Sequence, residues 1–120
     1  MKHCKKGRQF GRVRSQRLAL FRTLLNSLIQ HGRIVTTEAK AKEIRPMMDR
    51  LVTKVKRATA PGSGSQEAVR KIERDIPLVA VKKLIADIDR FSDRDSGYTR
   101  IIKMVPRVSD NAKMAIIEFV

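Results

Sequence analysis

Large apolar residues recur along three stretches of the chain at intervals of three and four, which places them on one side of an α-helix. A further, shorter stretch has the same spacing with only two apolar positions. We therefore predict four helices. Their apolar positions are Leu18, Phe21, Leu25 and Leu28, then Ile44, Met48, Leu51 and Val55, then Val69 and Ile72, and finally Leu78, Val81, Leu84, Ile85 and Ile88.

The ends of these helices also have signals in the sequence. Gly32 follows the first stretch and is expected to end it in a left-handed turn, and Phe91 is expected to close the last apolar stripe. Pro46 lies inside the second stretch, so that helix either kinks there or has a separate first turn. Short polar side chains that can cap the helix starts are Ser15, Thr37, Ser63 with Gln66, and Asp75.

Three segments have the β-branched and aromatic content of strands, namely 33–37, 98–105 and 113–120. The last two are separated by a turn-rich segment, 106–112, and are expected to form an antiparallel hairpin. The element order is then α-β-α-α-α-β-β. This order predicts an α+β fold of two layers, with helices packed on one face of a small three-stranded mixed sheet, forming a single globular domain over 15–120.

Residues 1–14 follow neither period, and we expect them to form an extended basic arm that becomes ordered against a partner. The whole chain of 120 residues has a net charge of +15, and nine Lys or Arg precede the first acidic residue, Glu38. Like charges gathered in this way repel one another in a compact protein. The distribution is typical of a protein that binds a polyanion, with nucleic acid favoured over an anionic membrane.

Several other classes find little support in the sequence. The apolar runs are too short for a spanning helix or a signal peptide, and the single cysteine, Cys4, fits a reducing compartment, so we expect a cytoplasmic protein. His3 and Cys4 are adjacent and the only other histidine is His31, which falls short of a zinc site. No nucleophile, acid pair or phosphate-binding loop has the required spacing, so we expect no enzyme, metal or cofactor.

Few aromatic residues remain outside the apolar stripes, which argues against a sheet that stacks single-stranded bases. Recognition of folded RNA through its shape and phosphates, or non-specific binding to DNA, fits the charge better. Charge alone does not separate the two.

Four blocks at consistent spacing resemble the bacterial large-subunit ribosomal protein family seventeen. They are "MKHCKKGRQFGR" at the start, "RIVTTEAKAKEIR" at 33–45 followed by "DRLVTKVK" at 49–56, "GYTRI" at 97–101 and "DNAKMAIIE" at 110–118. The resemblance implies a structural constituent of the large ribosomal subunit that binds its rRNA, with neighbouring ribosomal proteins near the peptide exit region. It also implies helices against a small sheet. The chain departs from the family at Gln16, where a histidine is usual, and at Ser96, where a second glycine precedes Gly97.

Charge and resemblance together give a set of residues expected to contact rRNA, through the arm and the basic surface. A nucleoid-type DNA-binding protein remains the alternative function. The expected RNA-binding residues are Lys2, His3, Lys5, Lys6, Arg8, Arg12, Arg14, Arg17, Arg22, Lys40, Arg94, Tyr98 and Arg100.

Overall fold

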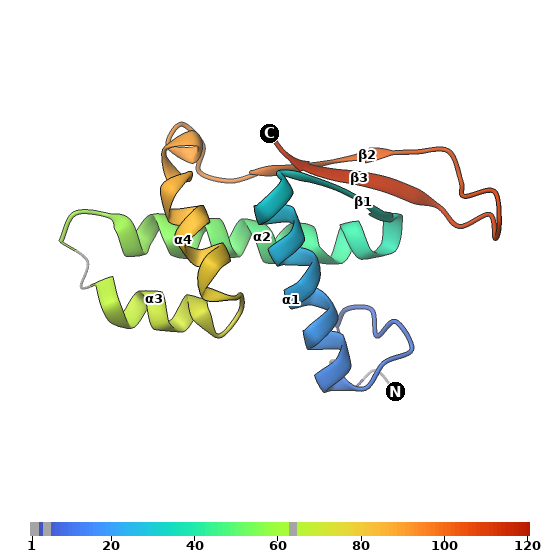
Figure 1. Ribbon diagram of the computed structural model, residues 1–120, viewed down its shortest axis with the longest axis horizontal. Coiled ribbons are helices and arrows are strands. Elements are labelled where there is room, and N and C mark those ends of the chain that lie inside the picture. Colours follow the sequence, from blue (N-terminus) through green and yellow to red (C-terminus); the bar gives the residue numbers. More distant parts are fainter. Residues whose placement is uncertain (1–2, 4–5, 63–64) are drawn as a thin grey trace.

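A computed structural model describes residues 3, 6–62 and 65–120. The chain forms a layer of helices beneath a small sheet, as the sequence predicted (Figure 1). In chain order the elements are α1 (Arg14–His31), β1 (Arg33–Thr37), α2 (Glu38–Thr59), α3 (Ser65–Glu73), α4 (Leu78–Ala86), the 3-10 helix η1 (Ile88–Phe91), β2 (Thr99–Lys103) and β3 (Met114–Phe119).

A single glycine connects α1 to the sheet. Gly32 has φ of 76°, and its N–H donates to the Leu28 carbonyl oxygen at 2.8 Å, so it is the left-handed C-cap expected from the sequence. The next five residues form β1, with the bounds that the sequence predicted. Because β1 follows so closely, the orientation of α1 is fixed by the edge of the sheet.

The central helix, α2, runs through Pro46 without ending. A proline at this position has no N–H to donate to the carbonyl oxygen of Lys42, and the packing of the remaining turns compensates for that loss. The apolar stripe of α2 is confirmed, because every predicted member is buried. The buried residues of α2 are Ala41, Ile44, Met48, Leu51, Val52, Val55 and Ala58.

Two predicted stripe residues are not in the core. Leu18 is 50% exposed on the first turns of α1, and Leu78 is 48% exposed at the start of α4. Both lie near a helix end, where the neighbouring helices no longer cover the stripe. In α4 the buried residues are Ala80, Val81 and Leu84. The first turns of α4 therefore contribute Ala80 to the core, and not Leu78 as predicted.

The helix starts also differ from the sequence prediction. α1 begins at Arg14 with Val13 as N-cap, so Ser15 is already inside the helix. Pro77 is the N-cap of α4, and Asp75 lies two residues before it, where its carboxylate pairs with Lys54 at 2.8 Å. Thr37 stands at the expected N-cap of α2 but makes no side-chain capping bond. The expected capping box involves Ser63, which lies outside the described residues.

The sheet has the strand order β1-β3-β2, and both pairings are antiparallel. The predicted hairpin of β2 and β3 is confirmed, whereas the prediction of a mixed sheet was wrong. β1 and β2 run in the same direction, but β3 lies between them, so no parallel pair forms.

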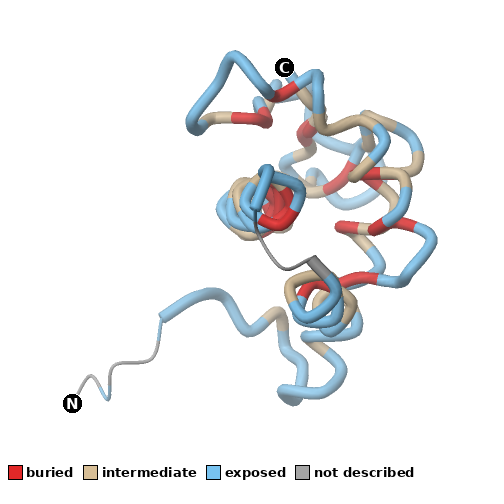
Figure 2. The backbone as a smooth tube through the Cα atoms, turned by 90° about the vertical axis from the view of Figure 1, so that its left-hand side faces the viewer, coloured by how far each residue is buried: buried red, intermediate tan, exposed pale blue. Residues whose placement is uncertain are grey.

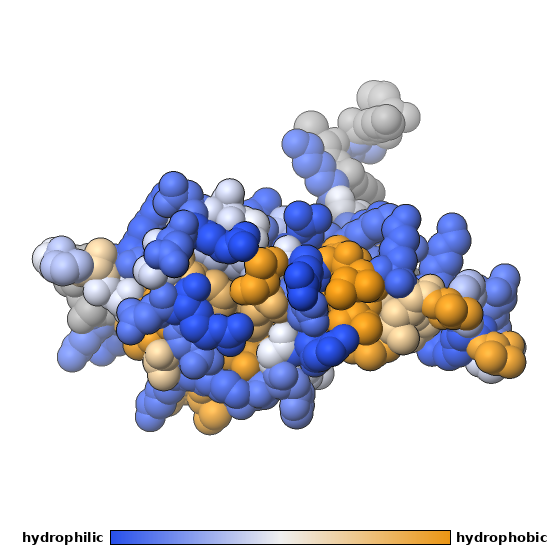
Figure 3. Space-filling model, turned by 90° about the horizontal axis from the view of Figure 1, so that it is seen from above, coloured by the Kyte–Doolittle hydropathy of each residue, from blue (hydrophilic) through white to orange (hydrophobic). Residues whose placement is uncertain are grey.

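The core lies between the sheet and the helices, where buried residues face one another (Figure 2). Ile34, Ile117 and Ile101 share one register row that turns toward α2. The next row, Val35, Ile116 and Ile102, points to the opposite face. Seen from above the sheet, apolar surface is exposed there (Figure 3). The helices therefore cover one face of the sheet only.

Candidate nucleic-acid interface

The described part of the arm is fixed to the body at two points. The ring of Phe10 packs edge-on against Phe21 of α1, with ring centroids 6.0 Å apart. Arg8 donates to Oε1 of Glu43 on α2 at 2.7 Å. Gly7 has φ of 90°, and a Cβ on it would lie 3.4 Å from Glu43, so a side chain here would be strained. Phe10 therefore packs against the core, whereas the arm was expected to become ordered only against a partner.

Beyond these contacts, the end of the arm and α1 carry four further arginines. Arg12, Arg14 and Arg22 are exposed and Arg17 is half-buried. Arg12 donates to the Phe10 carbonyl oxygen at 2.9 Å, and Arg17 to the Arg12 carbonyl oxygen at 3.5 Å. Within the described residues none of these four arginines has a carboxylate partner. Their charge is thus available to an external anion.

Two adjoining cavities extend this positive surface along the helices. The first, of about 380 Å³, lies between α1 and α2, and the second, of about 640 Å³, between α2 and α3; both include Lys54, Arg74 and Asp75. Asp75 is the only carboxylate in either lining, and Lys54 pairs with it. We call this surface the basic groove. Its cations are Arg22, Arg50, Lys54, Arg57, Lys71 and Arg74.

Of the cations of the basic groove, only Arg22 was predicted from the sequence. The spacing of the others nevertheless indicates that they share the polar side of their helices. Arg50, Lys54 and Arg57 follow one another at intervals of four and three, the same period as the apolar stripe of α2 but on its polar side. Lys71 and Arg74 have the corresponding spacing after the loop. Only the packing of α3 beside α2 brings these two rows together.

Arg94, Arg100 and Lys40 do not join this surface, and the predicted residues that precede Arg8 belong to the arm. Arg94 lies in the loop after η1, and Arg100 is on β2, where it pairs with Glu118 at 2.6 Å. Lys40 is half-buried in the first turn of α2. His3 and Lys6 are exposed, while Lys2 and Lys5 lie outside the described residues.

Tyr98 does not belong to the surface, which corrects its assignment to RNA binding. It is 1% exposed, its ring packs edge-on against Phe91 with centroids 5.5 Å apart, and its hydroxyl donates to the Arg94 carbonyl oxygen at 3.2 Å. Its backbone N–H donates to Asp49 on α2 at 3.2 Å. Tyr98 therefore holds the loop that carries Arg94.

Lys56 fixes the same loop from the side of α2. Its ammonium donates to the carbonyl oxygens of Phe91 at 3.0 Å and Arg94 at 2.5 Å, and lies 5.5 Å from the centre of the Tyr98 ring. At the end of the loop Gly97 has φ of 67°, whereas Ser96 is not among the residues with positive φ. The serine that departs from the resembled family is thus accommodated without strain.

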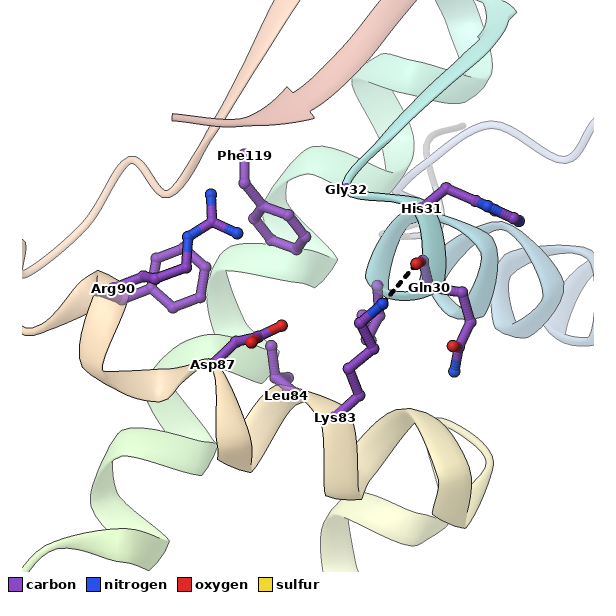
Figure 4. Close-up of a pocket in the computed structure, with 10 residues that line it drawn as sticks. Gln30, His31, Gly32, Lys83, Leu84, Asp87, Arg90 and Phe119 are labelled. Carbon is purple, nitrogen blue, oxygen red and sulfur yellow. Dashed lines mark hydrogen bonds between the residues drawn. The ribbon is translucent and has the colours of Figure 1, made fainter.

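A smaller cavity, of about 200 Å³, lies where α1 meets α4 and η1 (Figure 4). Lys83 points across it and donates to the Gln30 carbonyl oxygen at 2.6 Å, which satisfies one of the free carbonyls at the C-terminal end of α1. Asp87 and Arg90 lie on its other side with Phe119. Lys83 thus has a structural role, and no nucleophile and base face each other there.

The part of the chain that the structure describes contains neither a membrane-spanning helix nor a cluster of metal-ligating side chains. None of its helices is long and apolar enough to cross a membrane. Within the same residues, no group of three or more His, Cys, Asp or Glu side chains could hold a metal ion.

Comparison with known proteins gives a consistent result. Residues 20–120 match the family model described as ribosomal protein L17. The chain is 47% identical to the large ribosomal subunit protein bL17 of Shouchella clausii, over 93% of this chain and 97% of that protein. It is 43% identical to bL17 of Trichlorobacter lovleyi, over 100% of this chain and 94% of that protein. It is also 42% identical to bL17 of Geobacter metallireducens, over 100% of this chain and 65% of that protein.

Proposed function

The chain belongs to the ribosomal protein L17 family, and on that premise we propose that it is a structural constituent of the large ribosomal subunit that binds folded rRNA. The arm, α1 and the basic groove form its rRNA-binding surface. We also propose, from the family resemblance, that it lies near the peptide exit region beside other ribosomal proteins, in cytoplasmic ribosomes. A structural rather than catalytic role is in keeping with the family.

One observation carries the proposed binding surface. Arg12, Arg14, Arg17 and Arg22 lie on the arm and α1 without a carboxylate partner in the described residues, in a protein of net charge +15. Each arginine presents a planar fork of donors that suits a phosphate. The counterions that such contacts release from RNA supply the affinity.

The fixed position of the arm supports the same proposal. Because Phe10 is anchored on Phe21 and Arg8 on Glu43, part of the entropy cost of ordering the arm is met before RNA arrives. The arm cations then continue into the basic groove through Arg22, which is both an α1 residue and part of the groove lining. The two form one surface suited to a long polyanion.

Sedimentation tests the proposed function directly. A tagged full-length chain is produced in bacterial cells, the lysate is separated on a sucrose gradient at low magnesium to dissociate the subunits, and each fraction is probed for the tag. We expect the protein to sediment with large subunits. Recovery at the top of the gradient, or equally with small subunits, would contradict the proposal.

Competition separates the rRNA function from a nucleoid-type DNA protein. Large-subunit rRNA bound to the purified protein is challenged with duplex DNA of equal phosphate concentration. We expect the rRNA complex to persist, because shape as well as charge is recognised. Equal displacement by duplex DNA would instead favour the nucleoid alternative.

A further inference from the structure

The face of the sheet that points away from the helices carries rows of apolar side chains. Val35, Ile116 and Ile102 lie side by side across the three strands in register. Met114 is two residues from Ile116 on β3, and the Met104 N–H donates to the Met114 carbonyl oxygen at 2.9 Å, which extends the apolar rows toward the hairpin loop. We call this surface the open sheet face. It consists of Arg33, Val35, Thr37, Arg100, Ile102, Met104, Met114, Ile116 and Glu118.

Several large apolar side chains of the open sheet face and the adjoining hairpin loop are exposed to solvent. Val35 is 57% exposed, Ile102 42% and Met104 41%, and the hairpin loop beyond them adds Val105 at 84% and Val108 at 102%. Figure 3 looks down on this face and shows apolar surface gathered over the sheet with hydrophilic surface around it. A contiguous apolar patch of this kind on a soluble protein marks an interaction site.

Most cations of this region have a carboxylate partner within the described part of the protein. Glu118 lies between Arg33, at 3.4 Å, and Arg100, at 2.6 Å, and forms a polar row beside the apolar ones. In the hairpin loop Arg107 pairs with Asp110 at 2.7 Å. Lys103 lies 3.8 Å from Glu38. Four of the five cations of the strands and hairpin loop thus have a carboxylate partner, in contrast with Arg12, Arg14, Arg17 and Arg22 of the arm and α1.

These observations decide between three possible occupants. RNA would gain little from apolar rows or from arginines that are already paired, and it has the arm and basic groove to bind. A second copy would bring together two chains of net charge +15, which repel one another. A different protein with apolar side chains of its own would gain from the apolar rows, and it would not have to bring a second chain of the same charge of +15 to this face. The methionines suit such an interface, since they are enriched in interface cores and adapt to irregular surfaces.

We propose that another protein of the large ribosomal subunit docks on the open sheet face, with its apolar side chains against Val35, Ile102 and Met104. The Arg33–Glu118–Arg100 row forms the polar rim of that interface. This inference rests on the proposed function, because it takes the subunit as the place where the partner is met. It assigns the two sides of the molecule to different ligands, rRNA on the arm and helices, and protein on the sheet.

Site-specific crosslinking tests the inference. A photoreactive phenylalanine analogue replaces Ile102 in one full-length chain, Val35 in a second, and the 68% exposed Val79 of α4 in a control chain. Large subunits are purified from cells in which each chain replaces the resident copy, and are then irradiated. We expect the first two chains to crosslink to the same single ribosomal protein and the Val79 chain not to do so. Crosslinks to rRNA or to a second copy, or the same products from all three chains, would overturn the inference.

A second measurement does not depend on the analogue. The double variant Val35→Lys, Ile102→Lys is compared with Val79→Lys for rRNA affinity of the purified protein and for retention in large subunits after a high-salt wash. We expect the double variant to bind free rRNA at least as well as Val79→Lys but to be retained several-fold less. Equal retention would overturn the docking inference and leave the ribosomal function standing. Loss of free rRNA binding in the double variant alone would instead place RNA on this face and overturn the inference as well.

Discussion

Phe10 and Phe21 pack edge to face, with their ring centroids 6.0 Å apart and their planes at 77°. The two residues belong to different parts of the molecule, since Phe10 is in the arm and Phe21 is buried in α1. The contact holds the cations on either side of Phe10 at a fixed place beside α1. An arm with no such anchor would have to be ordered entirely by its ligand.

Replacement of Phe10 tests this anchor. Phe10 is half-buried, so Phe10→Ala should reduce the free energy of unfolding by about 1–2 kcal/mol, through lost apolar burial and the lost ring contact. Val13→Ala, at a 64% exposed position, is the control and should have little effect. Urea unfolding measures both. Equal stabilities for the two variants would show that Phe10 does not anchor the arm.

The apolar stripe of α1 provides a paired test of burial. Leu25→Ala, at a 4% exposed position, should cost about 2–5 kcal/mol of unfolding free energy, because it leaves a cavity in the core. Leu18→Ala, at a 50% exposed position of the same helix, should cost less than about 1 kcal/mol. Chemical denaturation separates the two, and similar costs would show that the faces of α1 are wrongly assigned.

Lys56 should matter more than its neighbour Lys54. Lys56→Met keeps the aliphatic stem but removes the donors to the Phe91 and Arg94 carbonyl oxygens, and we expect a loss of about 1–3 kcal/mol with faster amide exchange in the loop 92–97. Lys54→Met breaks only a solvent-exposed ion pair with Asp75 and should cost less than about 1 kcal/mol. If amide exchange in the loop were unchanged in Lys56→Met, the role of Lys56 would be disproved.

Asp110 should titrate far below an ordinary aspartate. Its hydrogen bonds from Arg107 and from the Ala112 N–H lower the pKa of the Asp110 carboxyl from 3.8 to about 2. The stabilisation of the hairpin loop is therefore complete above pH 3.8 and lost as the pH falls through about 2. NMR titration of the carboxyl carbon should give a midpoint near 2, and Arg107→Gln should raise it. A midpoint near 3.8 in the unaltered protein would contradict the pairing.

Local signals in the sequence predicted those parts of the fold that local chemistry determines. The strand 33–37, the stop at Gly32 and the buried stripe of α2 depend on residues close together in the chain. The exposure of Leu18 and Leu78 could not be predicted in this way, because it depends on where the neighbouring helices end. For the same reason the antiparallel sheet was missed, since only the tertiary arrangement inserts β3 between β1 and β2.

In the candidate site, too, the features that depend on neighbouring residues in the chain were predicted, whereas those that depend on helix packing were not. The charge of the arm was evident from the sequence, because its cations follow one another without an acid. The basic groove combines residues of three helices and exists only after they pack. Tyr98 was among the residues expected to bind RNA, although its side chain contributes to the core between α2 and β2.

The salt dependence of rRNA affinity tests the central claim most directly, with two variants that remove the same charge. In one, Arg12, Arg14, Arg17 and Arg22 become Gln; in the other, the internally paired Arg33, Arg100, Lys103 and Arg107 become Gln. If the first four contact phosphates, the slope of log affinity against log salt should flatten by about three units in the first variant. In the second it should change by less than about one unit. Equal flattening in both, or no change in the first, would contradict a specific rRNA-binding surface on the arm and α1.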